Sequence, residues 1–568
     1  MAIIQNYKIN LVIMITYVLM MMITEFLVIN TSKWWDPFVS IPFNTLFYVA
    51  VSWVICLLVS FTGKTISKYI HVLLHAVIFS YTISNIFLVV VFHRHWDAFT
   101  LQFLRETNLR EATEFIQGFI FDVKTLLFVL PSIIFFVVEY LLAKRVSCVP
   151  AFPKSKKRCA AMCCVLLFLL GNLYYFSTDY IRNYEVVAKY PSPIKRNNIW
   201  TFYQSILQYR HFQKEYDSCE NTLKNYTEHA WCTEKNADFV LIIGESFNRH
   251  YSNLYDGKWN TNPRLLKLKN TGRLFVFSDV IASDNGTSQN FKYLFSMNGV
   301  RDKGAWCDAP LLPTVMRRCG YNVIFYGNQF VVNDVLGEFD SSMGFLNHPY
   351  IAANLFDERN VKTYKYDMGL VEDYVENRMK LEKDRRNFCI FHLYGQHMKA
   401  ETRYPETFKK YNSENVGCKD KTKQQREDIA NYLNATLYND YVVSKIIELF
   451  ENRNAVVLYL SDHGEEIHDF RNQYGRTDLA SDTHQALKPQ LDIPFMIYFT
   501  PTYAGLHPYL VKGIKAALNK RFMSDDMAQV VCDILGVKSR FFRKTRSLIN
   551  YDYSEPKHRI LQNHVIYD

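Results

Sequence analysis

The sequence predicts two parts of different fold class: an N-terminal domain of five transmembrane helices and a C-terminal α/β domain, whose mostly parallel sheet has helices on both faces. Two observations predict this division. Apolar stretches of about 20 residues occur only before residue 180. Short apolar runs alternate with helical patterns beyond residue 236. With 568 residues, the chain is also too long for one ordinary globular domain.

Five segments of the N-terminal part are long and apolar enough to cross roughly 30 Å of hydrocarbon. They are residues 9–30, 41–62, 69–92, 122–143 and 159–177. The first segment is too long for the apolar core of a signal peptide, and four further spans follow it. The transmembrane domain is therefore expected to cover residues 1–180.

Basic residues in the short loops predict the orientation of the spans, because loops rich in lysine and arginine stay in the cytoplasm. The loop between spans two and three and the loop between spans four and five carry such residues: Lys64, Lys68, Lys144, Arg145, Lys154, Lys156, Lys157 and Arg158. With five spans, everything after residue 180 is expected on the opposite, external side of the membrane.

Charge and the connecting segments narrow the class of protein. The formal net charge of +10 is modest for this length, and no dense basic run indicates a nucleic-acid partner. Residues 93–121 carry apolar side chains at near-helical spacing, which is typical of an amphipathic helix on the outer membrane face. Residues 181–235 are expected to form a juxtamembrane connector with a short helix around 199–215.

Seven of the twelve cysteines lie beyond the spans, where an oxidising compartment allows disulfides. Proximity along the chain makes Cys219 with Cys232, and Cys307 with Cys319, the candidate pairs. Cys389 lies in a strand-like run and is expected to be a buried free thiol.

The C-terminal part contains six candidate strands: 238–244, 274–280, 322–327, 388–395, 455–461 and 494–500. The clearest helical pattern lies at 424–452. The strands are continuous apolar runs rather than alternating ones, which is typical of a parallel sheet covered by helices on both faces. In such sheets, ligands bind beyond the carboxyl ends of the strands. The domain is expected to cover residues 236–550, followed by a C-terminal tail at 551–568.

Polar side chains follow several of these strands directly. Glu245 ends "LIIGES", Asp462 and His463 end "AVVLYLSDHG", and a further histidine ends "FHLYGQH" at position 397. Thr287 lies in a glycine-containing turn shortly after the second strand. Two carboxylates, an imidazole and a hydroxyl suit zinc, which accepts nitrogen and oxygen ligands in tetrahedral geometry. The sequence therefore predicts a metal site at one rim of the sheet.

Each of these features also has a simpler interpretation. Asp-His-Gly at 462–464 is compatible with an ordinary turn that a capping aspartate begins. Glu245 can accept hydrogen bonds from the N-terminus of a following helix. Asn-Gly-Thr at 285–287 is also an N-glycosylation acceptor or a common turn. A single histidine such as His397 is more often structural, so only the combination favours a metal site.

Four motifs carry a resemblance to a known family. They are "GESFNRHYSNLYDG" (244–257), "NGTSQNFKYLFS" (285–296), "YLNATLYNDYVVSKII" (432–447) and "SDHGEE" (461–466). With the five spans before them, they resemble the membrane-bound phosphoethanolamine transferases that modify lipopolysaccharide, within the alkaline phosphatase and sulfatase superfamily. The resemblance covers nearly the whole chain and implies an alkaline-phosphatase/sulfatase-like fold for the C-terminal domain.

The resemblance also implies a set of zinc ligands: Glu245, Thr287, Asp462 and His463. Thr287 matches the family's nucleophile. One zinc ion is expected, and the further histidines are compatible with a second.

Other residues match positions that contact the substrate in the family. His397 and His484 are implied as catalytic and substrate-binding histidines, with His468 as a weaker rival of His484. Thr107 and Glu111, in "LRETNLREATEF", match the outer-loop stretch that helps to bind the lipid donor.

The implied activity is that of a zinc-dependent phosphoethanolamine transferase. It would move phosphoethanolamine from phosphatidylethanolamine to a lipopolysaccharide acceptor, either a lipid A phosphate or a core sugar, through a phospho-threonine intermediate. The implied location is the bacterial inner membrane, with several spans and the catalytic domain in the periplasm.

Two other classes of protein remain open at this point. A lipoteichoic-acid-synthase-like enzyme would share the five spans and a threonine nucleophile but transfer glycerol phosphate. A non-catalytic membrane protein could use the outer domain to bind lipid. A secreted sulfatase is less favoured, because the Cys/Ser-x-Pro-x-Arg context of its nucleophile is absent around Thr287.

Overall fold

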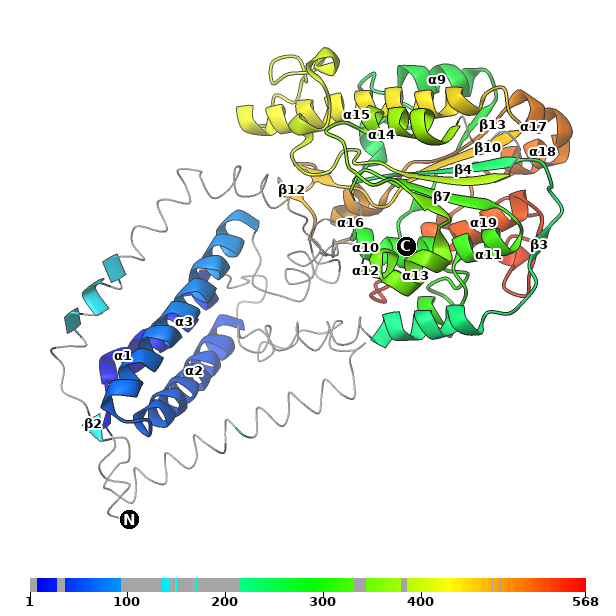
Figure 1. The fold of residues 1–568 in the computed structure, drawn as a ribbon. Coiled ribbons are helices and arrows are strands. Elements are labelled where there is room, and N and C mark those ends of the chain that lie inside the picture. The colour runs from blue at the N-terminus through cyan, green and yellow to red at the C-terminus, as the bar shows by residue number, and fades with distance from the viewer. Residues whose placement is uncertain are drawn as a thin grey trace. The chain divides into compact units, whose positions relative to one another are not determined.

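The structure of the protein is a computed structural model (Figure 1). It describes residues 8–27, 36–92, 214–329, 344–379 and 386–568, except 472, 478 and 480–482, together with isolated residues between 134 and 170. The chain forms two compact units, Met1–Phe212 and Gln213–Asp568.

Helices make up most of the described part of the N-terminal unit: α1 (Leu11–Leu27), α2 (Asp36–Ser60) and α3 (Lys64–Phe92). The three helices contact one another (Figure 1). Ile41–Ser60 and Thr65–Ile86 are long and apolar enough to cross a membrane, judged by length and composition alone. Leu11–Ile23 is a shorter apolar stretch of α1. A short pair of strands, β1 (Lys8–Ile9) and β2 (Val149–Pro150), joins two distant parts of this unit.

The first three predicted spans therefore coincide with helices, whereas the others are not tested. The fourth and fifth, at 122–143 and 159–177, lie mostly outside the described residues. The predicted amphipathic loop 93–121 lies wholly outside them. The number of five spans thus stays a prediction.

A group of polar side chains connects the helices of this unit. The Tyr17 hydroxyl of α1 lies 3.1 Å from His71 Nδ1 and 3.3 Å from His75 Nδ1 of α3. The Nε2 atom of His75 lies 2.9 Å from a carboxylate oxygen of Glu139. Tyr17 and Glu139 are both buried. Because buried polar groups need partners within the protein, these contacts join α1, α3 and Glu139.

The C-terminal unit is built on a seven-stranded sheet. Its strands, in spatial order, are β5 (Leu274–Val276), β13 (Phe495–Phe499), β10 (Ala455–Ser461), β4 (Asp238–Gly244), β9 (Asn387–His392), β7 (Asn322–Gly327) and β8 (Glu358–Arg359). The pairs from β10 to β8 are all parallel, and only β13 runs antiparallel to its two neighbours in this sheet. The predicted mostly parallel α/β sheet is therefore confirmed.

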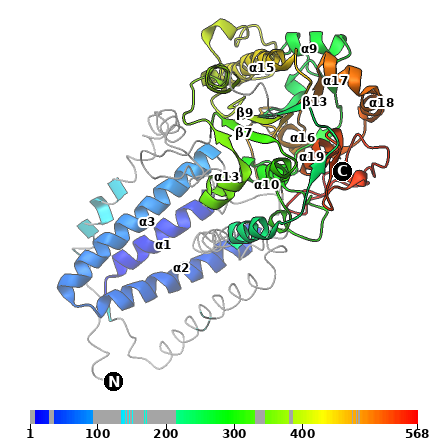
Figure 2. The same ribbon diagram turned by 45° about the vertical axis from the view of Figure 1, so that its right-hand side comes forward.

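Helices cover both faces of the sheet (Figures 1 and 2). One face is covered by α9 (Pro263–Asn270), α14 (Asp367–Tyr374) and α15 (Lys423–Phe450). The other is covered by α10 (Thr287–Phe295), α11 (Leu312–Arg318), α13 (Pro349–Leu355) and α19 (Met527–Ile534). Successive residues of β4 enter different cores: Leu241 packs in one and Ile242 in the other, both fully buried. Burial on both faces explains why the strand is a continuous apolar run.

Shorter elements complete the unit. The helices are α12 (Gly344–Asn347), α16 (His484–Leu491), α17 (Pro501–Leu506) and α18 (Pro508–Ala517). The paired strands are β3 (Trp231–Cys232) with β15 (Val537–Lys538), β6 (Val280–Ile281) with β14 (Phe522–Met523), and β11 (Glu466–Ile467) with β12 (Tyr474–Gly475).

Two predictions of extent differ from the structure. The run 274–280 forms two strands, β5 and β6, because the chain leaves the sheet between them while Phe277 remains fully buried in the core. The predicted tail 551–568 packs against the domain. Its Tyr567 is buried, and the hydroxyl donates to Asp492 Oδ1 at 2.5 Å.

The proposed disulfides are absent from the structure, in which all seven cysteines of the C-terminal unit are free thiols. The Cys232 thiol donates to the carbonyl of Glu234 and accepts a hydrogen bond from Arg386, whose second nitrogen donates to the carbonyl of Cys319. Chain proximity was therefore a poor guide, because the fold brings Cys232 beside Cys319 instead. Cys389 is buried in β9 as a free thiol, as predicted.

Candidate active site

The site lies where the two central parallel strands, β4 and β10, end side by side. Gly244 pairs with Ser461 at the last step of this ladder. The next residue of each strand is an acid, Glu245 after β4 and Asp462 after β10, and the amide of Asp462 donates to the carbonyl of Gly244 at 3.0 Å. Parallel pairing in this register therefore brings the two carboxylates to one point, where both are fully buried.

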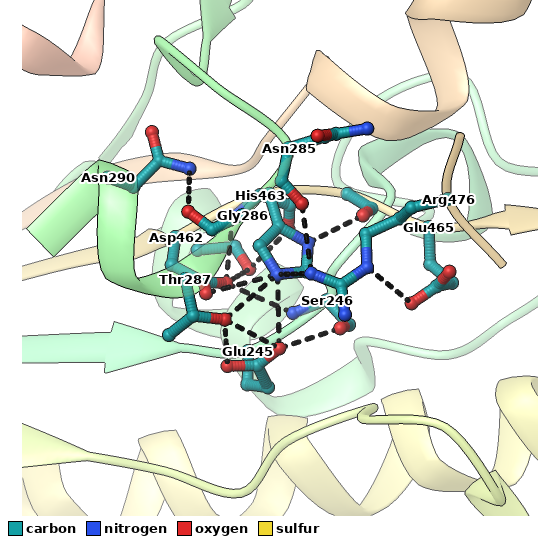
Figure 3. Close-up of polar contacts among 12 residues, drawn as sticks. Glu245, Ser246, Asn285, Gly286, Thr287, Asn290, Asp462, His463, Glu465 and Arg476 are labelled. Carbon is teal, nitrogen blue, oxygen red and sulfur yellow. Dashed lines mark hydrogen bonds and ion pairs between the residues drawn. The ribbon is translucent and has the colours of Figure 1, made fainter. Parts of the chain in front are cut away.

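His463 directs one ring nitrogen at both carboxylates (Figure 3). Its Nδ1 donates to the carbonyl of Gly464 at 2.7 Å, so Nε2 carries the lone pair. That Nε2 lies 3.2 Å from Glu245 Oε1 and 3.2 Å from Asp462 Oδ2. The tautomer that the backbone fixes is thus the one that presents Nε2 as a ligand.

Thr287 completes the cluster as the first residue of α10. Its hydroxyl lies 3.1 Å from His463 Nε2 and donates to Glu245 Oε2 at 3.2 Å (Figure 3). The three groups beneath it are fully buried, whereas Thr287 is half-buried. The nucleophile candidate therefore stands at the N-terminus of a helix, where the helix dipole favours negative charge.

Asn290, one turn into α10, holds the loop that carries Thr287. Its side-chain oxygen accepts from the amides of Ser283 and Asp284 at 3.2 and 3.1 Å. Its Nδ2 donates to the carbonyls of Asp284 and Gly286 at 2.6 and 3.1 Å. This side chain satisfies four loop groups at once and so fixes the position of the hydroxyl before any substrate arrives.

The turn after β4 contains a residue in an uncommon conformation. Ser246 has a φ of 57°, in the left-handed region that residues other than glycine seldom adopt. Its amide donates to Asp462 Oδ1 at 3.1 Å, and its hydroxyl donates to Glu245 Oε1 at 2.8 Å. The Tyr432 hydroxyl, from α15, donates to the carbonyl of Ser246 at 2.5 Å. Ser246 thereby orients both acids of the cluster, a common place for such strain.

The segment after β9 brings His397 towards the cluster. Gly395 has a φ of 52°, and a Cβ there would lie 2.8 Å from the Glu245 carbonyl oxygen, so only glycine fits. The Gln396 amide donates to that same carbonyl at 3.1 Å. His397 follows and stacks on Tyr394. Burial lowers the pKa of His397 to about 3, so its imidazole is neutral at physiological pH.

Burial controls the protonation of the cluster. Burial, together with the negative charge of Glu245, raises the pKa of Asp462 well above its usual value. Burial, together with the positive charge of Arg476, lowers the pKa of His463. The imidazole is therefore neutral, as a metal ligand must be, and a bound cation would let both carboxylates ionise.

The cluster fits a metal ion by its donors and by its unsatisfied groups. Ligand atoms of Glu245, Asp462 and His463 all lie within 4.8 Å of one another. The Oδ2 atom of Asp462 is buried and accepts no hydrogen bond from the described part of the chain. Two carboxylate oxygens, one imidazole nitrogen and a hydroxyl are a donor set that zinc accepts.

Other residues that the sequence singled out lie apart from this cluster or are not described. His484 is exposed at the start of α16, with its ring 4.9 Å from that of Tyr567. His468 is buried, and its Nε2 lies 2.8 Å from Asp428. Thr107 and Glu111 lie outside the described residues. The roles assigned to these four residues stay predictions.

Sequence reasoning missed three contributors, Ser246, Tyr432 and Arg476. Ser246 and Tyr432 stood inside the motifs quoted above, but a motif does not say which backbone group a side chain contacts. Arg476 donates from Nη1 to His463 Nε2 at 2.8 Å (Figure 3). Asn285 is buried and donates to the carbonyl of Thr477 at 2.7 Å, which argues against a glycosylated asparagine.

Comparison with known proteins agrees with this fold. The sequence profile of the sulfatase family matches residues 237–537, more than half of the chain. Phosphoethanolamine transferase EptC of Escherichia coli K12 is 24% identical over 512 residues, which cover 86% of this chain and 83% of that protein. Phosphoethanolamine transferase CptA of Salmonella typhimurium is 23% identical over 487 residues, covering 82% and 80%.

Two solved structures share the fold. The integral membrane protein lipooligosaccharide phosphoethanolamine transferase A of Neisseria meningitidis superposes with a TM-score of 0.62 at 15% identity, covering 95% of each chain. The C-terminal periplasmic domain of EptC from Escherichia coli gives 0.50 at 24% identity, covering 58% of this chain and 90% of that one. The chain therefore belongs to the sulfatase family, within which it resembles the phosphoethanolamine transferases.

Proposed function

We propose that the protein transfers phosphoethanolamine from phosphatidylethanolamine to a lipopolysaccharide acceptor, through a covalent intermediate on Thr287. The strongest support for the proposal is the position of the Thr287 hydroxyl. It lies at a helix N-terminus, within hydrogen-bond distance of Glu245 and His463. The curated relatives that span most of the chain are phosphoethanolamine transferases, which supports this headgroup over glycerol phosphate.

In the first half-reaction, Thr287 Oγ1 attacks the phosphorus of the donor. The bond from Oγ1 to phosphorus forms, the bond from phosphorus to the diacylglycerol oxygen breaks, and diacylglycerol leaves with a proton. The hydroxyl is oriented by its bond to Glu245 and by the α10 N-terminus, which favours the negative charge that develops on Oγ1.

In the second half-reaction, an acceptor hydroxyl or phosphate attacks the same phosphorus. The bond from the acceptor oxygen to phosphorus forms, the bond from phosphorus to Oγ1 breaks, and Thr287 regains a proton, which an acceptor hydroxyl supplies. Glu245, Asp462, His463 and Thr287 would hold the zinc ion. When bound, zinc activates a hydroxyl and neutralises charge on phosphoryl oxygens. A second ion near His397 remains a proposal from the resemblance, as do donor contacts by His484, Thr107 and Glu111.

The proposed location follows from the substrates. A donor with two acyl chains stays in a bilayer, so the enzyme has to be membrane-bound to meet it. We place the N-terminal unit in the bacterial inner membrane with five spans, and the C-terminal unit in the periplasm. The basic residues of the predicted cytoplasmic loops support this orientation.

Mass spectrometry of lipopolysaccharide tests the function. Cells that express the wild-type chain should gain a species heavier by one phosphoethanolamine group, and Thr287→Ala should abolish it. Fragmentation assigns the group to lipid A phosphate or to a core sugar. Thr271→Ala is the matched control, because the hydroxyl of that exposed threonine bonds only to the carbonyl of Leu268 among the described residues.

Other outcomes would reject the proposal. Full activity of Thr287→Ala would exclude the covalent route. Transfer from phosphatidylglycerol but not from phosphatidylethanolamine, in vesicles that contain both, would favour the glycerol phosphate alternative. No new species with the wild-type chain would favour a non-catalytic lipid-binding protein.

A further inference from the structure

Arg476 stands beside the nucleophile although no part of the proposed mechanism yet uses it. It directly follows β12, in the hairpin that β11 and β12 form, at the position after Gly475. Gly475 pairs with Glu466 and has a φ of 118°, a backbone conformation that only glycine adopts freely. The backbone therefore turns at Gly475 and sends the next side chain into the site, as Figure 3 shows.

Hydrogen bonds in both directions tie this segment to the loop that carries Thr287. The Nη1 atom of Arg476 donates to the carbonyl of Asn285 at 2.9 Å. In return, Asn285 Nδ2 donates to the carbonyl of Thr477 at 2.7 Å. The amide of Thr477 also donates to Gln490 Oε1 at 2.9 Å. The position of Arg476 relative to Thr287 is thus fixed by contacts on both sides of it in sequence.

The guanidinium and the Thr287 hydroxyl share one neighbour. His463 Nε2 lies 2.8 Å from Arg476 Nη1 and 3.1 Å from Thr287 Oγ1. The two groups therefore lie within about 6 Å of each other, a gap that a phosphoryl group bonded to one and hydrogen-bonded to the other can span.

Arg476 makes only a long ion pair with a described carboxylate. Its side chain is 12% exposed, and the carboxylate paired with it, that of Glu465, lies 3.7 Å from Nε. Its Nη2 makes no hydrogen bond to any described residue. Other buried basic side chains are paired more closely, such as Lys292 with Glu215 at 2.8 Å. Arg476 therefore keeps donors at Nη2 that a ligand can use.

We propose that Arg476 binds the non-bridging oxygens of the phosphoryl group that Thr287 attacks. This inference rests on the proposed phosphotransfer function. Arginine presents planar paired donors that match two oxygens of a phosphate, and it stays charged at any physiological pH. In phosphoryl transfer, most of the catalysis comes from positioning and from neutralising charge on those oxygens. Arg476 would add to the stabilisation of the phosphate that the resemblance implies for His397 and His484, whose roles stay predictions.

Binding of inorganic phosphate tests the inference without turnover. Titration calorimetry on the zinc-loaded full-length protein in detergent should show phosphate affinity at least about 10-fold weaker in Arg476→Gln, from the loss of a charge-assisted pair. Arg476→Lys keeps the charge but not the paired donors, so it should recover part of the affinity. Arg273→Gln is the matched control, because Arg273 pairs with Glu451, which is not part of the site. Its phosphate affinity should equal that of the wild type.

Two further measurements separate the outcomes. Zinc content by elemental analysis should be unchanged in Arg476→Gln, whereas kcat/KM for transfer should fall by roughly 10²–10³-fold, as for removal of one transition-state donor. Equal phosphate affinity of the wild type and Arg476→Gln would overturn the inference, and so would loss of zinc from that variant. If the wild type shows no transfer but Arg476→Gln still loses phosphate affinity, the proposed function fails and the phosphate site stands.

Discussion

The buried carboxylates at the two ends of the central strands differ in how completely the protein pairs them. At the amino end of β4, Asp238 is buried and fully partnered: Oδ1 accepts from the Asn387 amide at 2.9 Å, and Oδ2 lies 2.7 Å from Arg453 Nε. At the carboxyl end, Glu245 and Asp462 are buried against each other and a neutral imidazole, and Asp462 Oδ2 accepts no hydrogen bond from a described residue.

This difference in pairing indicates that only the carboxyl end has a use for a ligand. The amino end is complete without any ligand, because the protein supplies every partner of its carboxylate. The carboxyl end buries two acids side by side and leaves Asp462 Oδ2 without a hydrogen bond from a described residue, which costs stability unless a ligand compensates it. This contrast supports a cation site at the carboxyl end more strongly than the presence of an acid and a histidine alone.

The largest expected effect is at the carboxyl end. Asp462→Asn or His463→Ala should lower zinc affinity by more than about 100-fold, because changes to groups that merely support ligands already cost 10–100-fold. Transfer activity should fall with the metal. Elemental analysis of the purified protein measures the zinc. The matched variant at the amino end, Asp238→Asn, should bind as much zinc as the wild type. Equal zinc content in all three variants would show that the carboxyl end is not the metal site.

A further buried acid, Asp525, tests how the fold tolerates a carboxyl whose hydrogen bonds are incomplete. Asp525 Oδ1 has no hydrogen-bond partner among the described residues. Burial, together with the charge of Asp526, raises the pKa of Asp525 to about 8. Because the folded pKa exceeds the unfolded value, its contribution to stability is complete below about pH 4 and is lost as the pH rises through 8.

Asp525→Asn should therefore become more stable relative to the wild type as the pH rises from 4 to 8. The gain should be at most about 1.4 kcal/mol per pH unit. Thermal melting of the full-length protein in detergent, across this pH range, measures the difference. A difference that does not change with pH would mean that Asp525 is already ionised in the folded protein.

The smallest expected effect is at the amino end. Arg453→Ala should destabilise the protein by about 1–3 kcal/mol, since it leaves Asp238 without its charged partner in a site that is only partly open to water. Transfer activity at permissive temperature should be unchanged. Adding Asp238→Asn to this variant should restore part of the melting temperature, because a neutral side chain needs no counter-charge. Additive losses in the double variant would show that the pair is not coupled.

Much of the fold was predictable because both faces of the sheet are buried. The runs 238–244, 322–327 and 455–461 coincide with β4, β7 and β10 residue for residue. Apolar patterns do not encode strand direction, so the antiparallel setting of β13 was not predictable. The two-residue strand β8 is too short to leave any pattern.

The candidate site was predictable only where side chains follow strands directly. Glu245, Asp462 and His463 do so, and the register of β4 and β10 brings them together. Arg476 follows a two-residue strand, and its position depends on contacts with Asn285, nearly two hundred residues earlier in the chain. His484 was named from the family resemblance, because a histidine near a metal motif is visible in sequence, whereas the long-range hydrogen bond of Arg476 is not.

The contacts among Tyr17, His71, His75 and Glu139 have a consequence for how the N-terminal unit assembles during synthesis. The first and third helices leave the ribosome well before residue 139. The helices α1 and α3 can already pair through Tyr17, His71 and His75 once both are made. The contact between His75 and Glu139 forms only after residue 139 is synthesised, so it can stabilise the packing of α3 only late in assembly.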